Sequence, residues 1–256
     1  MKNIVYIVFI GIFVGCSTKT NTESKTIIPE APLLKSKTEG YFKAIGTEPF
    51  WGLEISEEMI RFQGIEAGSE FTAPHVEPIR AMDANVKLYR VNTESGEIEV
   101  TISMQNCSDG MSDNKHDYKV DLNLRRNNQK ENVNYSGCGN YIADYRLFDI
   151  WLLEELEGKN VTLADFAKEI PLLEINSSEK KFIGYGGCNR ISGKIFQERE
   201  LLRFTNIIST KMVCGETNME SAFLKALQSS TEYKIKNNRL YLTNQDGMKV
   251  IFKKVD

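Results

Sequence analysis

Short stretches in which apolar and polar residues alternate recur along most of this chain. Clear examples are residues 52–55, 97–104 and 118–124, and further short strands are expected at residues 201–204 and 240–243. Successive side chains of a β-strand point to opposite faces of a sheet, so this alternation predicts strands with one buried face. Turn residues such as Asp246-Gly247 separate some of these stretches, which favours hairpins. The chain is therefore predicted to be mainly β (α+β), with antiparallel strands in barrels or sandwiches.

One segment near the C-terminus has the period of a helix instead. Thr217 and Glu220 have the spacing of a capping box at a helix start. The residues that then form one apolar face are Met219, Ala222, Phe223, Ala226 and Leu227. One helix packed against the second half of the chain is expected.

The first residues have the pattern of an export signal. Lys2 precedes an apolar run over residues 4–14, and this run is shorter than the roughly 20 residues that a spanning helix needs. The run ends Phe13-Val14-Gly15-Cys16, which resembles the lipobox of bacterial lipoproteins. The resemblance implies cleavage after residue 15 and a diacylglycerol, with fatty acids such as palmitate, on the Cys16 thiol. Ser17 in the next position favours the outer membrane.

The rest of the chain is predicted to be a tether and two domains. Residues 16–39 are rich in Ser, Thr, Lys and Asn, which is typical of a flexible tether. Two small β-rich domains are expected at residues 40–146 and 147–256. The tether lacks an acidic run after Cys16, which favours a protein that faces the periplasm. The net charge of −3 comes without a basic block, so no nucleic-acid partner is expected.

The four remaining cysteines are Cys107, Cys138, Cys188 and Cys214. In an oxidising envelope, two cysteines in each predicted domain indicate one structural disulfide per domain. Each would close a loop of roughly 30 residues and stabilise its domain by about 3–4 kcal/mol. The alternative is a zinc site shared by the four thiols. Zinc sites usually contain cysteines separated by about two to four residues, a spacing absent here, so disulfides are favoured and no metal or cofactor is predicted.

Two motifs stand out in the second predicted domain. They are Gly186-Gly187-Cys188-Asn189-Arg190 and Ser209-Thr210-Lys211-Met212-Val213-Cys214, followed by Glu220. Over about residues 148–254 the chain resembles the META/HslJ domain family. The resemblance implies a compact β-rich domain with one helix, found in envelope proteins linked to stress resistance. It implies no reaction.

The first predicted domain carries a different signature. It consists of Gly46-Thr47-Glu48-Pro49-Phe50-Trp51, Cys107-Ser108-Asp109-Gly110-Met111-Ser112 and Gly137-Cys138-Gly139. These residues resemble an uncharacterised family of bacterial envelope lipoproteins. The Tyr-Pro that this family usually shows after Met-Ser is missing here, where Asp117-Tyr118-Lys119 stands instead.

Four residues are candidates for ligand binding, each with a structural alternative. Trp51 either lies in a binding groove or in the core with its N–H bonded to a carbonyl. Asp109 either binds Ca²⁺ or belongs to a plain turn. Asn189 and Arg190 either contact a carboxylate or phosphate ligand or satisfy the local backbone. The structural alternative is favoured for Trp51, for Asp109 and for the Asn189-Arg190 pair.

No catalytic group of residues emerges from the sequence. The two histidines are His75, between prolines, and His116, in a stretch with turn composition. Neither has a partner at metal-ligand spacing. The leading hypothesis is a non-enzymatic, lipid-anchored envelope protein that binds an unknown envelope protein or small ligand, or acts under envelope stress. The alternatives are an inhibitor of an exported hydrolase such as lysozyme and, third, a cell-envelope enzyme.

Overall fold

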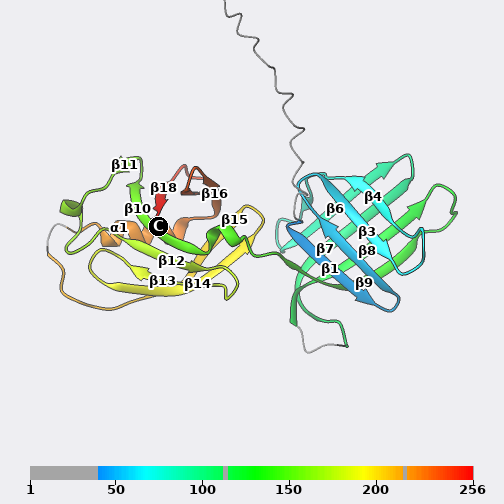
Figure 1. The fold of residues 1–256 in the computed structure, drawn as a ribbon, viewed down its shortest axis with the longest axis horizontal. Coiled ribbons are helices and arrows are strands. Elements are labelled where there is room, and N and C mark those ends of the chain that lie inside the picture. Colours follow the sequence, from blue (N-terminus) through cyan, green and yellow to red (C-terminus); the bar gives the residue numbers. More distant parts are fainter. Residues whose placement is uncertain (1–39, 112–114, 216–217, 256) are drawn as a thin grey trace, which may run out of the picture. The chain divides into compact units, whose positions relative to one another are not determined.

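The computed structural model describes residues 40–111, 115–215 and 218–255 of the chain. The described residues belong to one compact unit. Two nine-stranded antiparallel sheets make up most of this unit (Figure 1). The predicted signal peptide, the lipid attachment at Cys16 and the tether lie outside the described residues. Among the described residues, no helix is both long and apolar enough to cross a bilayer.

The first sheet is an open half-barrel. Its strand order is β4-β3-β2-β1-β9-β8-β7-β6-β5, so that β1 and β9 pair in the middle of the sheet. The strands are β1 (Phe42–Thr47), β2 (Phe50–Ile55), β3 (Met59–Gly64), β4 (Phe71–Pro74), β5 (Ile79–Arg80), β6 (Val86–Thr93), β7 (Gly96–Ser108), β8 (Lys115–Arg126) and β9 (Val133–Tyr141).

The second sheet closes into an eight-stranded barrel because β10 pairs with both β12 and β18. Short strand β11 (Lys159–Asn160) adds to β10 outside this ring. The other elements are η1 (Tyr145–Leu147), β10 (Asp149–Leu156), η2 (Leu163–Asp165), β12 (Leu172–Asn176), β13 (Lys181–Tyr185), β14 (Arg190–Glu198), β15 (Leu201–Ser209), α1 (Glu220–Ser229), β16 (Glu232–Lys236), β17 (Arg239–Thr243) and β18 (Lys249–Lys254).

Alternating burial along the strands explains both sheets. In β7, Ile98, Val100 and Ile102 are buried while the residues between them are partly exposed. Each sheet encloses its own hydrophobic core. The predicted fold class is thus confirmed: the chain is mainly β, with two antiparallel barrel-type sheets and one packed helix.

Helix α1 packs on β15 and β18 of the closed barrel. Its buried apolar residues are Phe223, Ala226 and Leu227, as the helical period predicted. Its start differs from the predicted capping box. Thr217 lies outside the described residues, the side chain of Asn218 accepts the backbone N–H of Glu220, and the Glu220 carboxylate bonds to Asn189 instead.

Candidate binding groove

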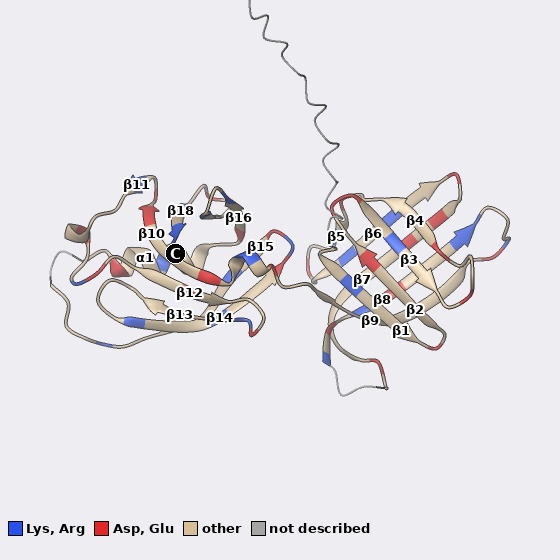
Figure 2. Cartoon of the chain, in the orientation of Figure 1, with Lys and Arg blue, Asp and Glu red and all other residues tan. Residues whose placement is uncertain are grey.

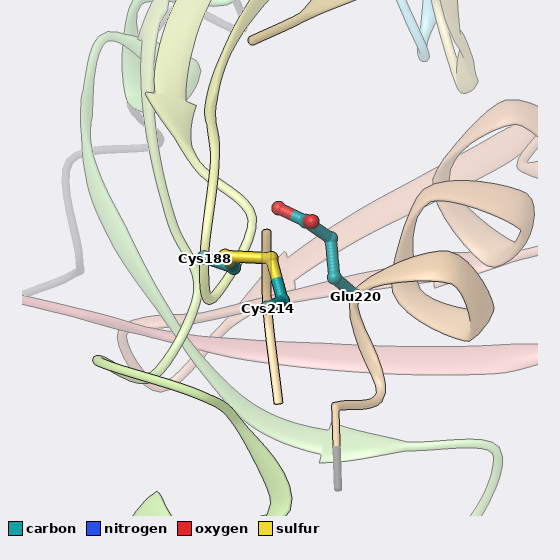
Figure 3. Close-up of side chains that lie close together, drawn as sticks. All are labelled: Cys188, Cys214 and Glu220. Atoms are coloured by element: carbon teal, nitrogen blue, oxygen red, sulfur yellow. A yellow bond between two sulfur atoms is a disulfide. The ribbon is translucent and has the colours of Figure 1, made fainter. Parts of the chain in front are cut away.

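Both predicted disulfides are present. Cys107 pairs with Cys138 and Cys188 with Cys214, with Cα atoms 5.6 Å and 6.1 Å apart. Figure 3 shows the Glu220 side chain beside the Cys188–Cys214 bridge. An oxygen of Glu220 and the two sulfurs lie within 4.8 Å of one another. Because these sulfurs are bonded to each other, they do not supply the thiolates that a zinc site needs.

Asn189 connects this bridge to the surrounding strands. Its side chain is buried, and its amide nitrogen donates to Glu220 at 2.7 Å. Its backbone N–H donates to the same carboxylate at 2.8 Å. Its side-chain oxygen accepts hydrogen bonds from the Thr210 hydroxyl and the Met212 backbone N–H. Asn189 therefore satisfies the local backbone, as the structural alternative predicted, and is not placed to bind a ligand.

Glycine is required at the bend before Cys188. Gly187 has a φ of +109°, and a Cβ there would lie 2.4 Å from a ring carbon of Phe166. A larger residue would combine an unfavourable backbone conformation with a steric clash. The bend connects β13 to β14 and so places Arg190 at the first position of β14.

An open groove of about 680 Å³ lies where β12, β13, β14 and β15 run side by side. In these strands Leu173 and Phe182 are buried in the core. Their neighbours Leu172 and Ile183 therefore point to the outer face of the barrel and line the groove. Ile208 of β15 also lines it and is 68% exposed. The volume lies within the range of about 300–1,000 Å³ that is typical of ligand sites.

The groove has charges of both signs beside its apolar residues. Arg190 lines it and is exposed, and the carboxylates of Glu169 and Glu174 line it too. The Tyr185 hydroxyl has a raised pKa because of desolvation and the negative charges of Glu169 and Glu220. It therefore remains a protonated hydrogen-bond donor at neutral pH. Polar, charged and apolar groups are thus all accessible to one ligand.

The family of this barrel follows from its sequence. Residues 146–256 match the META domain family over the whole closed barrel. This part of the chain is a META domain. No curated protein sequence shows a significant match to the chain.

Several solved structures resemble part of the chain. A protein from Burkholderia xenovorans solved by NMR is 21% identical, with 43% of this chain and 85% of that chain covered and a TM-score of 0.36. A second NMR structure is 23% identical over 42% and 90% of the two chains, with a TM-score of 0.34. A duf4847 family protein from Bacteroides vulgatus is 16% identical over 43% and 96%, with a TM-score of 0.31.

Outside the META domain, Trp51 is a core residue of the half-barrel. It is 5% exposed and packs near Phe62 and Tyr135. The expectation that its N–H bonds to a carbonyl is wrong, because the buried indole nitrogen has no hydrogen-bond partner among the described residues. Close packing of the ring against Gly46 and Gly137 leaves little room for one. Trp51 is therefore not exposed to a ligand.

The other half-barrel candidates have local partners. The Asp109 carboxylate accepts the backbone N–H of Met111 at 3.1 Å, which is a turn interaction; Ser112 and Asp113 lie outside the described residues. His75 shares a hydrogen bond with the Tyr41 hydroxyl at 2.9 Å. His116 lies in β8 opposite Cys107 and bonds to the Asn140 side chain. Its expected place in an exposed turn is wrong because β8 begins at Lys115.

Of the four candidates for binding, only Arg190 lines the groove of the META domain. The sequence did not single out Glu169, Ile183 or Ile208, although all three line it as well. In β13, Ile183 lies on the face opposite the core residue Phe182. In β15, strict alternation from the buried Leu202 and Phe204 would place Ile208 inward, and the register shift between β14 and β15 turns it outward. The sequence therefore does not show that the two isoleucines lie on one concave surface.

Proposed function

We propose that this chain is an exported, lipid-anchored and non-enzymatic envelope protein that binds a segment of another envelope protein through the Arg190 groove. The observation that carries the proposal is the groove itself, which joins exposed isoleucines, a guanidinium and two carboxylates on one face of the META domain. The leading hypothesis from the sequence is thus retained, with a protein segment as the partner.

The mixed character of the groove favours a polypeptide over other ligands. A polyanion would be repelled by Glu169 and Glu174, and a simple cation by Arg190. A protein segment offers apolar side chains for Ile183 and Ile208 together with charges of both signs. Exposed apolar surface bounded by polar residues is characteristic of protein interaction sites.

The residues lining the groove also favour binding over catalysis. The lining hydroxyls are those of Tyr185, Ser192, Ser209 and Thr210, and no histidine lines the groove. Both histidines of the chain belong to the half-barrel. A hydroxyl nucleophile generally needs an adjacent base.

Export and anchoring are supported by the leader pattern ending at Cys16 and by the two disulfides, which are characteristic of oxidising compartments. The test is fractionation of a bacterium that makes the full chain and is grown with labelled palmitate. Wild type and Ser17→Ala should carry label in the membrane fraction, and Cys16→Ser should lose the label. Label retained by Cys16→Ser would contradict a lipid on this residue.

The groove is tested by capture from solubilised envelopes with the lipidated chain as bait. Ile183→Lys and Arg190→Ala should each reduce the amount of a captured partner protein at least ten-fold. Ile79→Lys is the matched control, since Ile79 is a similarly exposed isoleucine of the half-barrel, and it should capture as wild type does. Equal capture by all variants would reject the groove as the binding site.

A further inference from the structure

A buried ion pair joins the two sheets, outside the groove. Glu198 ends β14 and is 2% exposed, and Lys87 of β6 is 5% exposed. The Lys87 ammonium lies 2.8 Å from the Glu198 carboxylate. A charge buried to this degree is costly unless it is paired and hydrogen-bonded. Each residue therefore depends on the other sheet for its partner.

The half-barrel surrounds the Glu198 carboxylate with hydrogen-bond donors. Lys87 donates to one oxygen, and the Asn85 amide at 2.7 Å and the Tyr118 hydroxyl at 2.5 Å donate to the other. The Asn85 side-chain oxygen in turn accepts a hydrogen bond from Lys87 at 2.6 Å. Burial raises the pKa of Tyr118, with Glu198 adding to it, so its hydroxyl stays protonated and available to donate.

The next residue strengthens the same contact. Arg199, at the turn between β14 and β15, pairs with Glu57 at 2.6 Å and with Glu77 at 2.9 Å. Its guanidinium also lies 5.2 Å from the centre of the Tyr41 ring. The tip of this hairpin thus presents an acidic and a basic side chain, each matched by opposite charge on the half-barrel.

Space remains beside the carboxylate. A cavity of about 290 Å³ is lined by Arg80, Lys87, Tyr89, Tyr141 and Glu198, among others. Arg80 adds a second positive charge to the same wall. The half-barrel's part of the wall therefore carries two positive charges and two tyrosines, while residues 198–201, 232 and 245 of the META domain form the rest.

We propose that the half-barrel has a binding site for carboxylates, formed by Lys87, Asn85 and Tyr118, and that Glu198 of the META domain occupies it within the same chain. The site keeps its donors when the carboxylate is removed, because they lie on the half-barrel: Lys87 and Tyr118 on strands β6 and β8, which both pair with β7, and Asn85 directly before β6. A free carboxylate of similar size would then bind in place of Glu198.

Chemical rescue of a full-chain variant tests this site. Glu198→Ala removes the same carbon and oxygen atoms that acetate contains. At an acetate concentration about five times the dissociation constant, the Tm of Glu198→Ala should be on the order of 2–4 °C higher than its Tm in chloride of equal ionic strength. Wild type, whose site is occupied, and Glu198→Ala/Lys87→Met, which lacks the ammonium, should show no such difference.

The matched control is Glu179→Ala, which removes an exposed carboxylate of the META domain that does not line this cavity. It should show no acetate-specific stabilisation. Equal effects of acetate and chloride on Glu198→Ala, or the same acetate effect on Glu179→Ala, would overturn the proposal. Neither result depends on the groove around Arg190.

A second variant covers the case in which Glu198→Ala does not fold. Glu198→Gln keeps the shape of the side chain but removes its charge. Lys87 should then react at least ten-fold faster with a lysine-modifying reagent, read by mass spectrometry, whereas exposed Lys43 should react equally in both proteins. Unchanged protection of Lys87 would show that the carboxylate does not hold it.

Discussion

At the scale of the residue, three positions of the first signature form one packing unit. Gly46 and Trp51 are paired across β1 and β2, and a Cβ on Gly46 would lie 1.9 Å from the Trp51 indole nitrogen. A Cβ on Gly137 of β9 would lie 2.7 Å from the same ring. The two glycines therefore make room for the indole, and Cys138 next to Gly137 joins this unit to the disulfide.

This close packing predicts a strong effect of one methyl group. Gly46→Ala should destabilise the half-barrel by about 1–3 kcal/mol, because the Trp51 indole must move to make room for the added methyl group. Gly52→Ala is the control in the adjacent strand, where an added Cβ meets nothing within 4 Å, and its effect should stay within about 0.5–1 kcal/mol. Urea unfolding followed by tryptophan fluorescence measures both. Similar midpoints for the two variants would argue against the packing described.

At the scale of the element, the disulfide next to α1 joins segments that no strand pairing connects directly. Cys188 follows β13, and Cys214 lies in the segment between β15 and α1. Asn189 and Glu220 then hydrogen-bond across the same junction. The two motifs of the META domain are thus held together by one covalent bond and a buried hydrogen-bond network.

Removing this bridge should weaken the META domain by a predictable amount. With a sequence separation of 26 residues, the double variant Cys188→Ala/Cys214→Ala should lose about 3–4 kcal/mol of unfolding free energy. Cys107→Ala/Cys138→Ala, with a separation of 31 residues, is the matched comparison. Dithiothreitol should destabilise wild type more than either variant, because each variant retains only one reducible bridge. A reductant effect of equal size in all three proteins would contradict this.

At the scale of the whole molecule, Asp144 anchors the segment that connects the two sheets. It lies between β9 and η1, and its carboxylate accepts hydrogen bonds from Arg146 at 2.7 Å and from the Tyr233 hydroxyl at 2.9 Å. Burial alone would raise the pKa of Asp144, but the hydrogen bonds and charge of Arg146, with the Tyr233 hydroxyl, outweigh it and hold that pKa below its usual value. The charged form is therefore favoured in the folded state.

A lowered carboxyl pKa makes its contribution dependent on pH. The stabilisation is present above the pKa of the unfolded state, about 3.9, and is lost as the pH falls through the lower folded value. Asp144→Asn should cost about 1–3 kcal/mol at pH 7, and this difference should shrink below about pH 4. Urea unfolding of wild type and Asp144→Asn at pH 7 and below about pH 4 measures this difference in unfolding free energy. A difference that does not change with pH would show that charge is not the cause.

The sequence by itself predicts the strands from alternating segments and the disulfides from two cysteines in each half. It predicts the family of the second half from two motifs. Each of these signals is local or compositional. The sequence does not predict strands such as β1 and β9 individually, since they include glycines whose role depends on Trp51. The groove around Arg190 requires four strands to be brought together. Glu198 looks like a solvent-exposed turn residue in the sequence. Only the tertiary structure decides its burial, because the desolvation of a carboxylate is compensated by Lys87, 111 residues away.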